Sequence, residues 1–231
     1  MGKPTPTTTF GTPSAYGANA GQAFVGYSGS YDQNSSRRAD GSMAFGAGFG
    51  SATDSVGLEV DVGFDSLSNN GGEHFADSGS VGFKIHKIIP DSNGLGVALG
   101  WSNAKDWGVA QDTDETVYVA ATKGFALNPN GNNVLPVSFT LGAGTGTFRS
   151  IEDIRKGKKG DNAPNLFGSA GIVLIPELSF ATSWTGNQLN AGFGISPFSI
   201  PLSLSAGYTD VTAKSKDGRA YNFNVGYSFT Y

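Results

Sequence analysis

The stretch that decides the fold is the run YNFNVGYSFTY, which extends from Tyr221 to Tyr231. Aromatic and aliphatic residues take every second position, and asparagine, glycine, serine and threonine take the positions between them. Successive side chains of a β-strand point to opposite faces, so the alternation predicts a strand with one large apolar face and one small polar face. A strand of a soluble protein could carry the same pattern, so the rest of the sequence has to distinguish the two cases.

The same alternation recurs along the chain and predicts about twelve strands separated by turn-rich segments. The expected strands lie near residues 22–33, 41–51, 56–65, 81–86, 95–102, 116–127, 135–144, 167–175, 178–184, 189–196, 202–208 and 221–231. A short helix is expected only near 150–156. The segments after even-numbered strands are short, and those after odd-numbered strands are mostly longer and more charged. An up-and-down barrel has this asymmetry between its ends, whereas a soluble sandwich gives no reason for it.

Composition narrows the possible functions. The chain has 231 residues with 35 glycines and no cysteine, and 38% of its residues are hydrophobic. Taken alone, these values also suit a soluble, glycine-rich all-β protein. No run approaches the roughly 18 apolar residues of a membrane-spanning helix. The absence of cysteine excludes disulfides and thiol chemistry, and a net charge of −4 argues against nucleic-acid binding.

The small face of the strands indicates which side points outward. In a soluble barrel or sandwich, bulky residues point inward and the outside is charged. Here the face opposite the bulky residues holds mostly glycine, serine, asparagine, threonine and alanine, which suits the lining of a narrow barrel. Aromatic residues fall near strand ends, as at a membrane interface. The residues expected at the two interfaces are Tyr31, Trp101, Trp184, Tyr208, Phe229 and Tyr231.

The terminal run and its repeats resemble bacterial outer-membrane β-barrels, in particular small porin-like proteins. The resemblance implies an all-β, transmembrane antiparallel up-and-down barrel of about twelve strands over residues 22–231. It also implies contact with outer-membrane lipid and recognition of the last strand by the barrel-assembly machinery. Both termini would be periplasmic in a Gram-negative bacterium. The glycine-rich strands are similar to small outer-membrane proteins of cyanobacteria.

The N-terminal segment, residues 1–21, lacks strand alternation. We expect it to be either a periplasmic tail or a partial plug of the barrel. Met1 is followed by GKPTPTTTF, which has no apolar core of a signal peptide, so we expect this sequence to be the mature form.

Inward-facing charges concentrate on the third and fourth strands. A hairpin folded symmetrically about positions 72 and 73 would place Asp61 opposite Lys84 and Glu59 opposite His86. These groups could tune ion passage, or they could be paired charges that only stabilise the wall.

Asp65 is the better candidate for a role in ion selectivity. Small residues are expected to line the rest of the pore: Gly142, Gly144, Gly192, Gly194, Ser203 and Ser205. Two lysines share the lipid-facing phase, although a charged side chain is unfavourable there. Lys123 would face lipid unless a bulge at Gly124 shifts the strand, and Lys87 lies near a strand end, from which it could reach the interface.

The predicted function is therefore a channel for passive diffusion of ions or small solutes through a narrow pore lined by glycine and serine. The alternative is a closed structural or docking barrel that binds a partner through its loops or its N-terminal segment. The chain has two histidines, His74 and His86, and neither stands in a nucleophile motif or has metal-ligand spacing. We accordingly predict no enzyme activity, catalytic residue, metal or cofactor.

Overall fold

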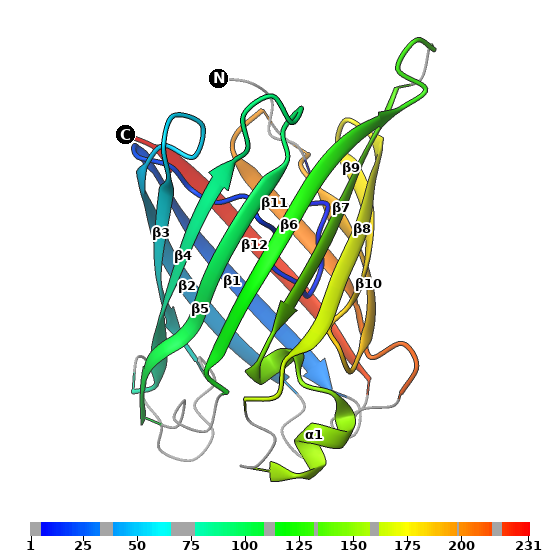
Figure 1. Cartoon of the computed structure of the whole chain (residues 1–231). Helices are drawn as coiled ribbons and strands as arrows, with labels where there is room; N and C mark the ends of the chain where they lie inside the picture. Colours follow the sequence, from blue (N-terminus) through cyan, green and yellow to red (C-terminus); the bar gives the residue numbers. More distant parts are fainter. Residues whose placement is uncertain are drawn as a thin grey trace.

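The computed structural model describes residues 6–32, 39–65, 77–108, 114–131, 134–157, 162–197, 199–213 and 219–231. The chain forms a closed barrel of twelve antiparallel strands, in which each strand pairs with its neighbours in sequence and β1 closes onto β12 (Figure 1). The expected fold is thereby confirmed. The strands are β1 (Gln22–Asp32), β2 (Ala39–Gly50), β3 (Gly57–Phe64), β4 (Gly79–Ile88), β5 (Gly96–Trp107), β6 (Thr116–Leu127), β7 (Leu135–Gly144), β8 (Asn165–Ile175), β9 (Leu178–Trp184), β10 (Leu189–Ile195), β11 (Leu202–Thr209) and β12 (Ala220–Thr230).

Two short helical elements lie in the β7–β8 connection: the 3₁₀ turn η2 (Gly146–Phe148) and helix α1 (Ile151–Arg155). Helix α1 begins after Ser150, whose side chain accepts a hydrogen bond from the backbone N–H of Asp153 at 3.1 Å. A serine at this position satisfies a backbone donor that the first helical turn leaves free. Within the described residues, no helix is long and apolar enough to cross a membrane.

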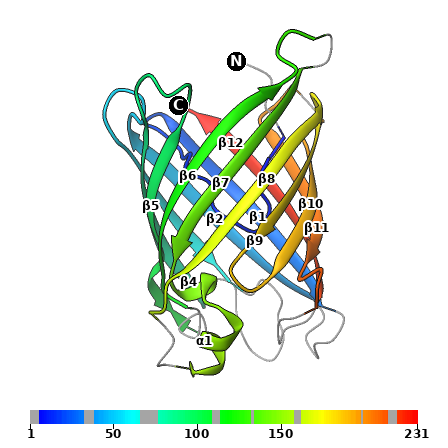
Figure 2. The same cartoon turned by 45° about the vertical axis from the view of Figure 1, so that its right-hand side comes forward.

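The two ends of the barrel differ, and both termini lie at the same end (Figures 1 and 2). We call the end with the termini the turn end, because the connections after even-numbered strands lie there. We call the other the loop end; it holds the connections after odd-numbered strands, including η2 and α1.

The barrel closes where the terminal run meets the first strand. Pairing runs from Gln22 opposite Thr230 to Asp32 opposite Ala220, so the seam is hydrogen-bonded along its whole length. A closed barrel leaves no unpaired strand edge, which is the condition for strands to lie in a hydrocarbon environment.

Exposure separates the two faces as the sequence predicts. Outward residues such as Leu141 and Leu166 are 66% and 61% exposed, whereas the inward Asn190 and Ser179 are 2% and 0% exposed. The bulky apolar residues therefore cover the outside, and small polar residues cover the inside. This arrangement is the reverse of a soluble barrel and is typical of a barrel surrounded by lipid.

Whether Lys123 faces lipid depends on a bulge in β6. No bulge occurs at Gly124, because β6 pairs with β7 in unbroken register through Lys123 opposite Phe139. Lys123 keeps the outward phase and places its ammonium group 5.4 Å from the ring centre of Phe125, a favourable cation–π contact. Register shifts lie elsewhere, between Val81 and Phe83 where β4 meets β5, and between Val173 and Ile175 where β8 meets β9.

Lys87 also lies on the outward face, and its ammonium group donates to the carbonyl oxygen of Ser55 in the turn between β2 and β3. The bond carries the charge to the turn end, as expected for a lysine that reaches from an apolar surface toward the interface.

Candidate functional site in the barrel interior

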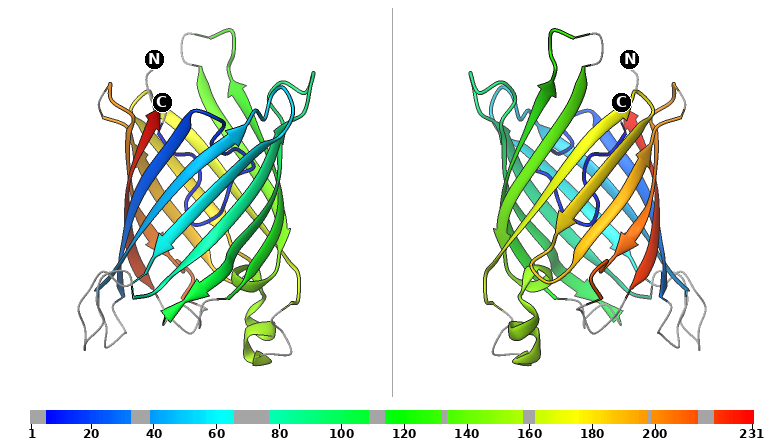
Figure 3. Two further views of the ribbon diagram at one scale, coloured as in Figure 1. Left: turned by 90° about the vertical axis from the view of Figure 1, so that its left-hand side faces the viewer. Right: turned by 90° about the vertical axis from the view of Figure 1, so that its right-hand side faces the viewer.

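Residues 6–21 lie inside the barrel, and we call them the insert. The insert enters at the turn end, descends as an open loop and returns toward the same end (Figure 3). In the first part of the insert, residues 6–10, the hydroxyl of Ser179 donates to the carbonyl of Thr7, and the hydroxyl of Ser183 donates to the carbonyl of Phe10. Both serines belong to β9, so this strand holds the first part of the insert through the insert's backbone carbonyls.

The middle of the insert is held by β6 and by the β4–β5 turn. The backbone N–H of Ala15 donates to Thr122 Oγ1 at 2.8 Å, and Thr122 shares a second hydrogen bond of 2.8 Å with Thr140. The phenolic hydroxyl of Tyr16 donates to the carbonyl of Gly94 at 2.8 Å.

Ala18 is held at both of its backbone groups. Its N–H donates to Glu59 Oε2 at 2.7 Å, and its carbonyl lies 3.0 Å from His86 Nε2. A carbonyl only accepts, so this contact assigns the ring proton of His86 to Nε2. The next residue, Asn19, accepts from the backbone N–H of Ala52 at 2.7 Å through Oδ1.

Glycines in the wall make room for the insert. A Cβ atom on Gly171 would lie 2.1 Å from the carbonyl oxygen of Thr8, and a Cβ on Gly48 would lie 2.3 Å from the carbonyl carbon of Ala18. Real side chains do not approach so closely, so any other residue would displace the insert. Other wall glycines lie close to residues of the insert: Gly96 on β5, Gly192 and Gly194 on β10, and Gly207 on β11.

The charged residues of β3 and β4 form a wall beside Ala18, which we call the charged wall: Glu59, Asp61, Lys84 and His86. The expected register was wrong by two residues. Glu59 lies opposite Lys84, with Lys84 Nζ 2.7 Å from Glu59 Oε1, and His86 lies opposite Gly57. A shift of two keeps every side chain on its face, so the alternation could not distinguish the two registers.

Glu59 thus accepts from both Lys84 and the insert, and Asp61 lies opposite Gly82. A Cβ on Gly82 would lie 2.6 Å from the Asp61 carboxylate, so the glycine provides space for that group. No group of three or more His, Cys, Asp or Glu that could hold a metal ion occurs among the described residues. His74 lies outside the described residues.

Asp65 does not belong to the charged wall. It follows the last residue of β3, and its N–H donates to the carbonyl of Ser78 at 3.1 Å. It therefore stands at the loop end of the barrel rather than at the level of the charged wall.

An aromatic cluster narrows the interior near the loop end. Phe148 of η2 stacks on Phe167 with ring centres 4.0 Å apart, and Tyr118 meets both rings edge-on. Gly142 and Gly144 lie beneath this cluster, since their Cβ atoms would come within 2.2 Å of Phe167 and 2.6 Å of Phe148.

The inward fold of η2 is fixed by polar contacts around the buried Arg149. Its side chain donates to Gly146 O at 2.9 Å and forms an ion pair with Asp114. Asn187 donates to the carbonyls of Arg149 and Thr147 at 2.9 and 3.3 Å. Sequence analysis did not predict this cluster, because Phe148 lies in a loop and a loop residue carries no periodic signal.

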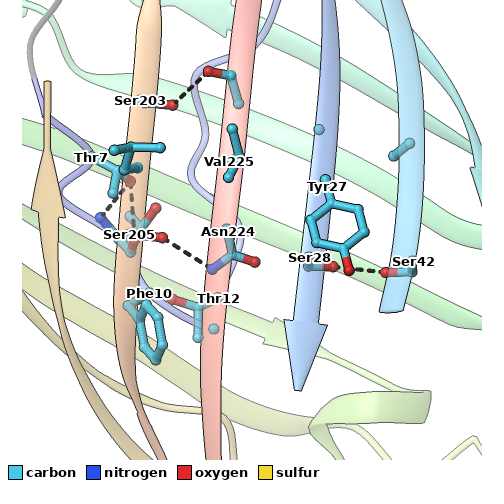
Figure 4. A pocket seen from close by; sticks show the side chains of 16 residues that line it. Thr7, Phe10, Thr12, Tyr27, Ser28, Ser42, Ser203, Ser205, Asn224 and Val225 are labelled. Carbon is cyan, nitrogen blue, oxygen red and sulfur yellow. Dashed lines mark hydrogen bonds between the residues drawn. The ribbon is translucent and has the colours of Figure 1, made fainter. Parts of the chain in front are cut away.

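Between the insert and the opposite wall, the interior retains open space. A cavity of about 340 Å³ lies between the insert and strands β1, β2, β11 and β12 (Figure 4). A second cavity of about 820 Å³ lies nearer the turn end, against β1, β11 and β12. Both touch Ser203, so they lie end to end along β11. Of the small residues expected to line a pore, Ser203 and Ser205 border this space, whereas Gly192 and Gly194 are covered by the insert.

The expected interface aromatics lie on the outer surface at both ends. Toward the loop end, Tyr31 lies opposite Tyr221, and Tyr221 packs against Tyr208 with ring centres 4.8 Å apart. Trp184 ends β9, also at the loop end, and Phe229 and Tyr231 lie at the turn end.

Trp101 lies within β5 rather than at its end, because this strand continues to Trp107. It is nevertheless level with the start of β6, and its indole N–H donates to Glu115 at 2.7 Å. An indole with an apolar body and a hydrogen-bonded polar edge is typical of a membrane interface.

An apolar exterior, a small polar interior and a closed twelve-stranded sheet together define a β-barrel of the outer-membrane class. No family model matches the sequence, and no curated protein matches it. Among solved structures, the fold is similar to that of the outer membrane protein Omp33 of Acinetobacter baumannii, with 11% identity, a TM-score of 0.52, and coverage of 91% of this chain and 98% of that chain. It is also similar to the KdgM porin, with 11% identity, a TM-score of 0.51, and coverage of 89% and 99%. At this identity the likeness concerns the fold.

Proposed function

We propose that this protein is an outer-membrane channel for passive diffusion of ions or small solutes, narrowed by its own insert. The observation that carries the proposal is the pair of adjoining cavities, of about 340 and 820 Å³, between the insert and the wall of β1, β11 and β12. A channel needs continuous space with a polar lining, and two neighbouring cavities on one side of the insert support such a path.

The space exists for two reasons. Twelve strands enclose a wider interior than eight strands do. Side chains alone fill the interior of an eight-stranded barrel. The insert then bonds mainly to β3, β4, β6 and β9, which leaves the seam side free. On the seam side the wall consists largely of small residues such as Gly26, Ser203 and Gly226.

The proposed location is the outer membrane of a Gram-negative bacterium, with the turn end and both termini in the periplasm. The apolar outer face would contact lipid, and the barrel-assembly machinery would recognise β12, which forms the seam with β1. The fold likeness to Omp33 and the KdgM porin supports this location. Because the glycine-rich strands are similar to small outer-membrane proteins of cyanobacteria, we propose a cyanobacterial origin.

We propose that acidic side chains act at two depths along the barrel axis. Asp65 stands at the loop end and would attract cations to the mouth, whereas Asp61 belongs to the charged wall. If the channel conducts, Asp65→Asn should reduce its preference for cations, measured as the reversal potential in a KCl gradient. An unchanged reversal potential would remove Asp65 from the selectivity mechanism.

Planar-bilayer recording tests the channel itself. The purified chain should insert and produce discrete conductance steps in KCl. The same sample should migrate faster on a gel before heating than after it, as folded barrels do. Persistent electrical silence from protein that passes the gel test would overturn the channel function.

The alternative, a closed docking barrel, is favoured by a different observation. The insert and the aromatic cluster of Tyr118, Phe148 and Phe167 both obstruct the interior. A variant that lacks residues 1–18 distinguishes the two functions. Steps of similar frequency from both proteins support the channel, and steps from the shortened variant alone support a barrel that its insert keeps closed.

A further inference from the structure

The cavity of about 340 Å³ has an unusual chemistry for a route of ions. The insert supplies one side, including Thr7, Thr9 and Thr12, and the barrel wall supplies the other. None of the described residues that line it carries a charge. A charged solute would lose its hydration there without meeting an opposite charge, which is costly. A neutral solute would not bear this cost.

Hydroxyl and amide groups line the wall and keep hydrogen-bonding capacity. Ser28 and Ser42 share one hydrogen bond of 2.7 Å, and Asn224 donates to Ser205 Oγ at 3.0 Å (Figure 4). A hydroxyl can donate once and accept twice, so each of these serines retains hydrogen-bonding capacity beyond this one bond. The wall can therefore pair with a solute that carries several hydroxyl groups.

Thr12 provides an independent indication of a ligand. It lies on the insert, lines the cavity and is only 9% exposed. Its buried Oγ1 has no hydrogen-bond partner among the described residues. A buried hydroxyl without a partner costs free energy, and a small shift of the insert that exposes Oγ1 to the cavity would let a solute hydroxyl supply the partner.

Phe10 lines the same cavity with the small part of its surface that is not buried. Its ring is buried against two wall glycines, and Cβ atoms on Gly192 and Gly207 would lie within 2.8 and 2.6 Å of it. A site that combines one aromatic ring with several hydroxyl groups suits a ligand with C–H faces and O–H edges.

We propose that this cavity binds one neutral polyhydroxylated solute of about the size of a monosaccharide, and that the insert forms half of the binding site. The volume lies in the range of about 300–1,000 Å³ that small-molecule sites occupy. The inference rests on the proposed channel and names the class of solute that the channel would take. The insert then acts as part of the site that selects the solute, in addition to narrowing the pore.

Binding of D-glucose to the full chain in detergent micelles tests the inference without any need for conductance. Titration by saturation-transfer NMR should give a saturable signal. D-glucuronate, which has a similar size and a negative charge, should bind at least about tenfold more weakly, because the cavity offers its carboxylate no cation.

Substitutions at Thr12 locate the site. Thr12→Val removes a hydroxyl that has no partner among the described residues, and it should weaken glucose binding by about threefold to tenfold, which corresponds to the loss of one hydrogen bond. Thr12→Ser should bind within about twofold of the parent chain. Thr53→Val, the same change in the β2–β3 turn, serves as the control and should have no effect.

Each possible result either supports or overturns the inference that the cavity binds a neutral polyhydroxylated solute. Equal binding of glucose and glucuronate, no binding of either, or full affinity in Thr12→Val would overturn the inference. A channel that conducts but does not bind glucose contradicts this inference alone. A chain that binds glucose as described but remains silent in bilayers contradicts only the channel function.

Discussion

The contact between Glu59 and Ala18 predicts how firmly the insert is held. Glu59→Gln keeps the size of the side chain and an oxygen that can accept from the Ala18 N–H, but it removes the charge. A hydrogen bond to a charged group contributes about 1.5–3 kcal/mol, and one between neutral groups about 0.5–1.5 kcal/mol. The substitution should therefore weaken docking of the insert by about 1–1.5 kcal/mol, which corresponds to roughly a tenfold larger undocked population. Loss of the ion pair with Lys84 affects the docked and undocked barrels alike and largely cancels from this difference.

A single introduced cysteine measures the undocked population, because the chain contains no cysteine of its own. Ala15 belongs to the insert and is fully buried against the wall, so Ala15→Cys should react with a water-soluble maleimide only when the insert leaves its site. Adding Glu59→Gln should raise the reaction rate by roughly tenfold.

Glu115→Gln is the matched control, because Glu115 bonds to Trp101 on the outside and not to the insert. It should leave the labelling rate unchanged. Equal labelling rates with Glu59 and Gln at this position, in protein that still shows heat-modifiable migration, would refute the role of Glu59 as an anchor. Rapid labelling in the Ala15→Cys parent would refute stable docking altogether.

Three further predictions concern the wall, the loop end and helix α1. Gly171→Val should collide with the carbonyl of the insert and displace it, so single-channel conductance should rise while gel migration still reports a folded barrel; unchanged conductance would contradict the close approach. Asn187→Ala removes two hydrogen bonds that hold η2 and should lower stability toward urea by about 1–3 kcal/mol, with equal unfolding midpoints as the contrary result. The pKa of Asp153 lies below its ordinary value because Lys156 and then Ser150 hydrogen-bond its carboxylate, so the stabilisation is present above the ordinary pKa and is lost as pH falls through the lowered one. Ser150→Ala should raise the pKa of Asp153 in an NMR titration, and an unchanged pKa would show that the serine contributes nothing.

The strand pattern was predictable because each strand carries its own signal. The predicted bounds agree with β6, β7 and β9 at both ends, since turn residues flank those strands on each side. The end of β5 was missed by five residues, because the segment after Ser102 lacks alternation and pairs with β4 only after the register shift between Val81 and Phe83. Alternation in the sequence indicates where strands lie, but it does not reveal a shift in the pairing of two strands.

The charged wall shows the same limit at a functional position. The sequence placed Glu59, Asp61, Lys84 and His86 on one inward face, and the structure has them there. The partner of each residue was wrong, because registers that differ by two residues satisfy the same alternation. The second partner of Glu59, the N–H of Ala18, lies 41 positions away in a segment without a pattern.

The sequence by itself determined the class of the barrel, the number of strands, the face that points outward and the placement of both termini at one end. These properties follow from alternation and connector length, which are local along the chain. Only the tertiary structure decided that residues 6–21 lie inside, that Phe148 folds in from a loop, and that the open space lies along the seam. Those features depend on hydrogen bonds and on contacts at glycines between segments far apart in sequence, where no periodicity indicates a partner.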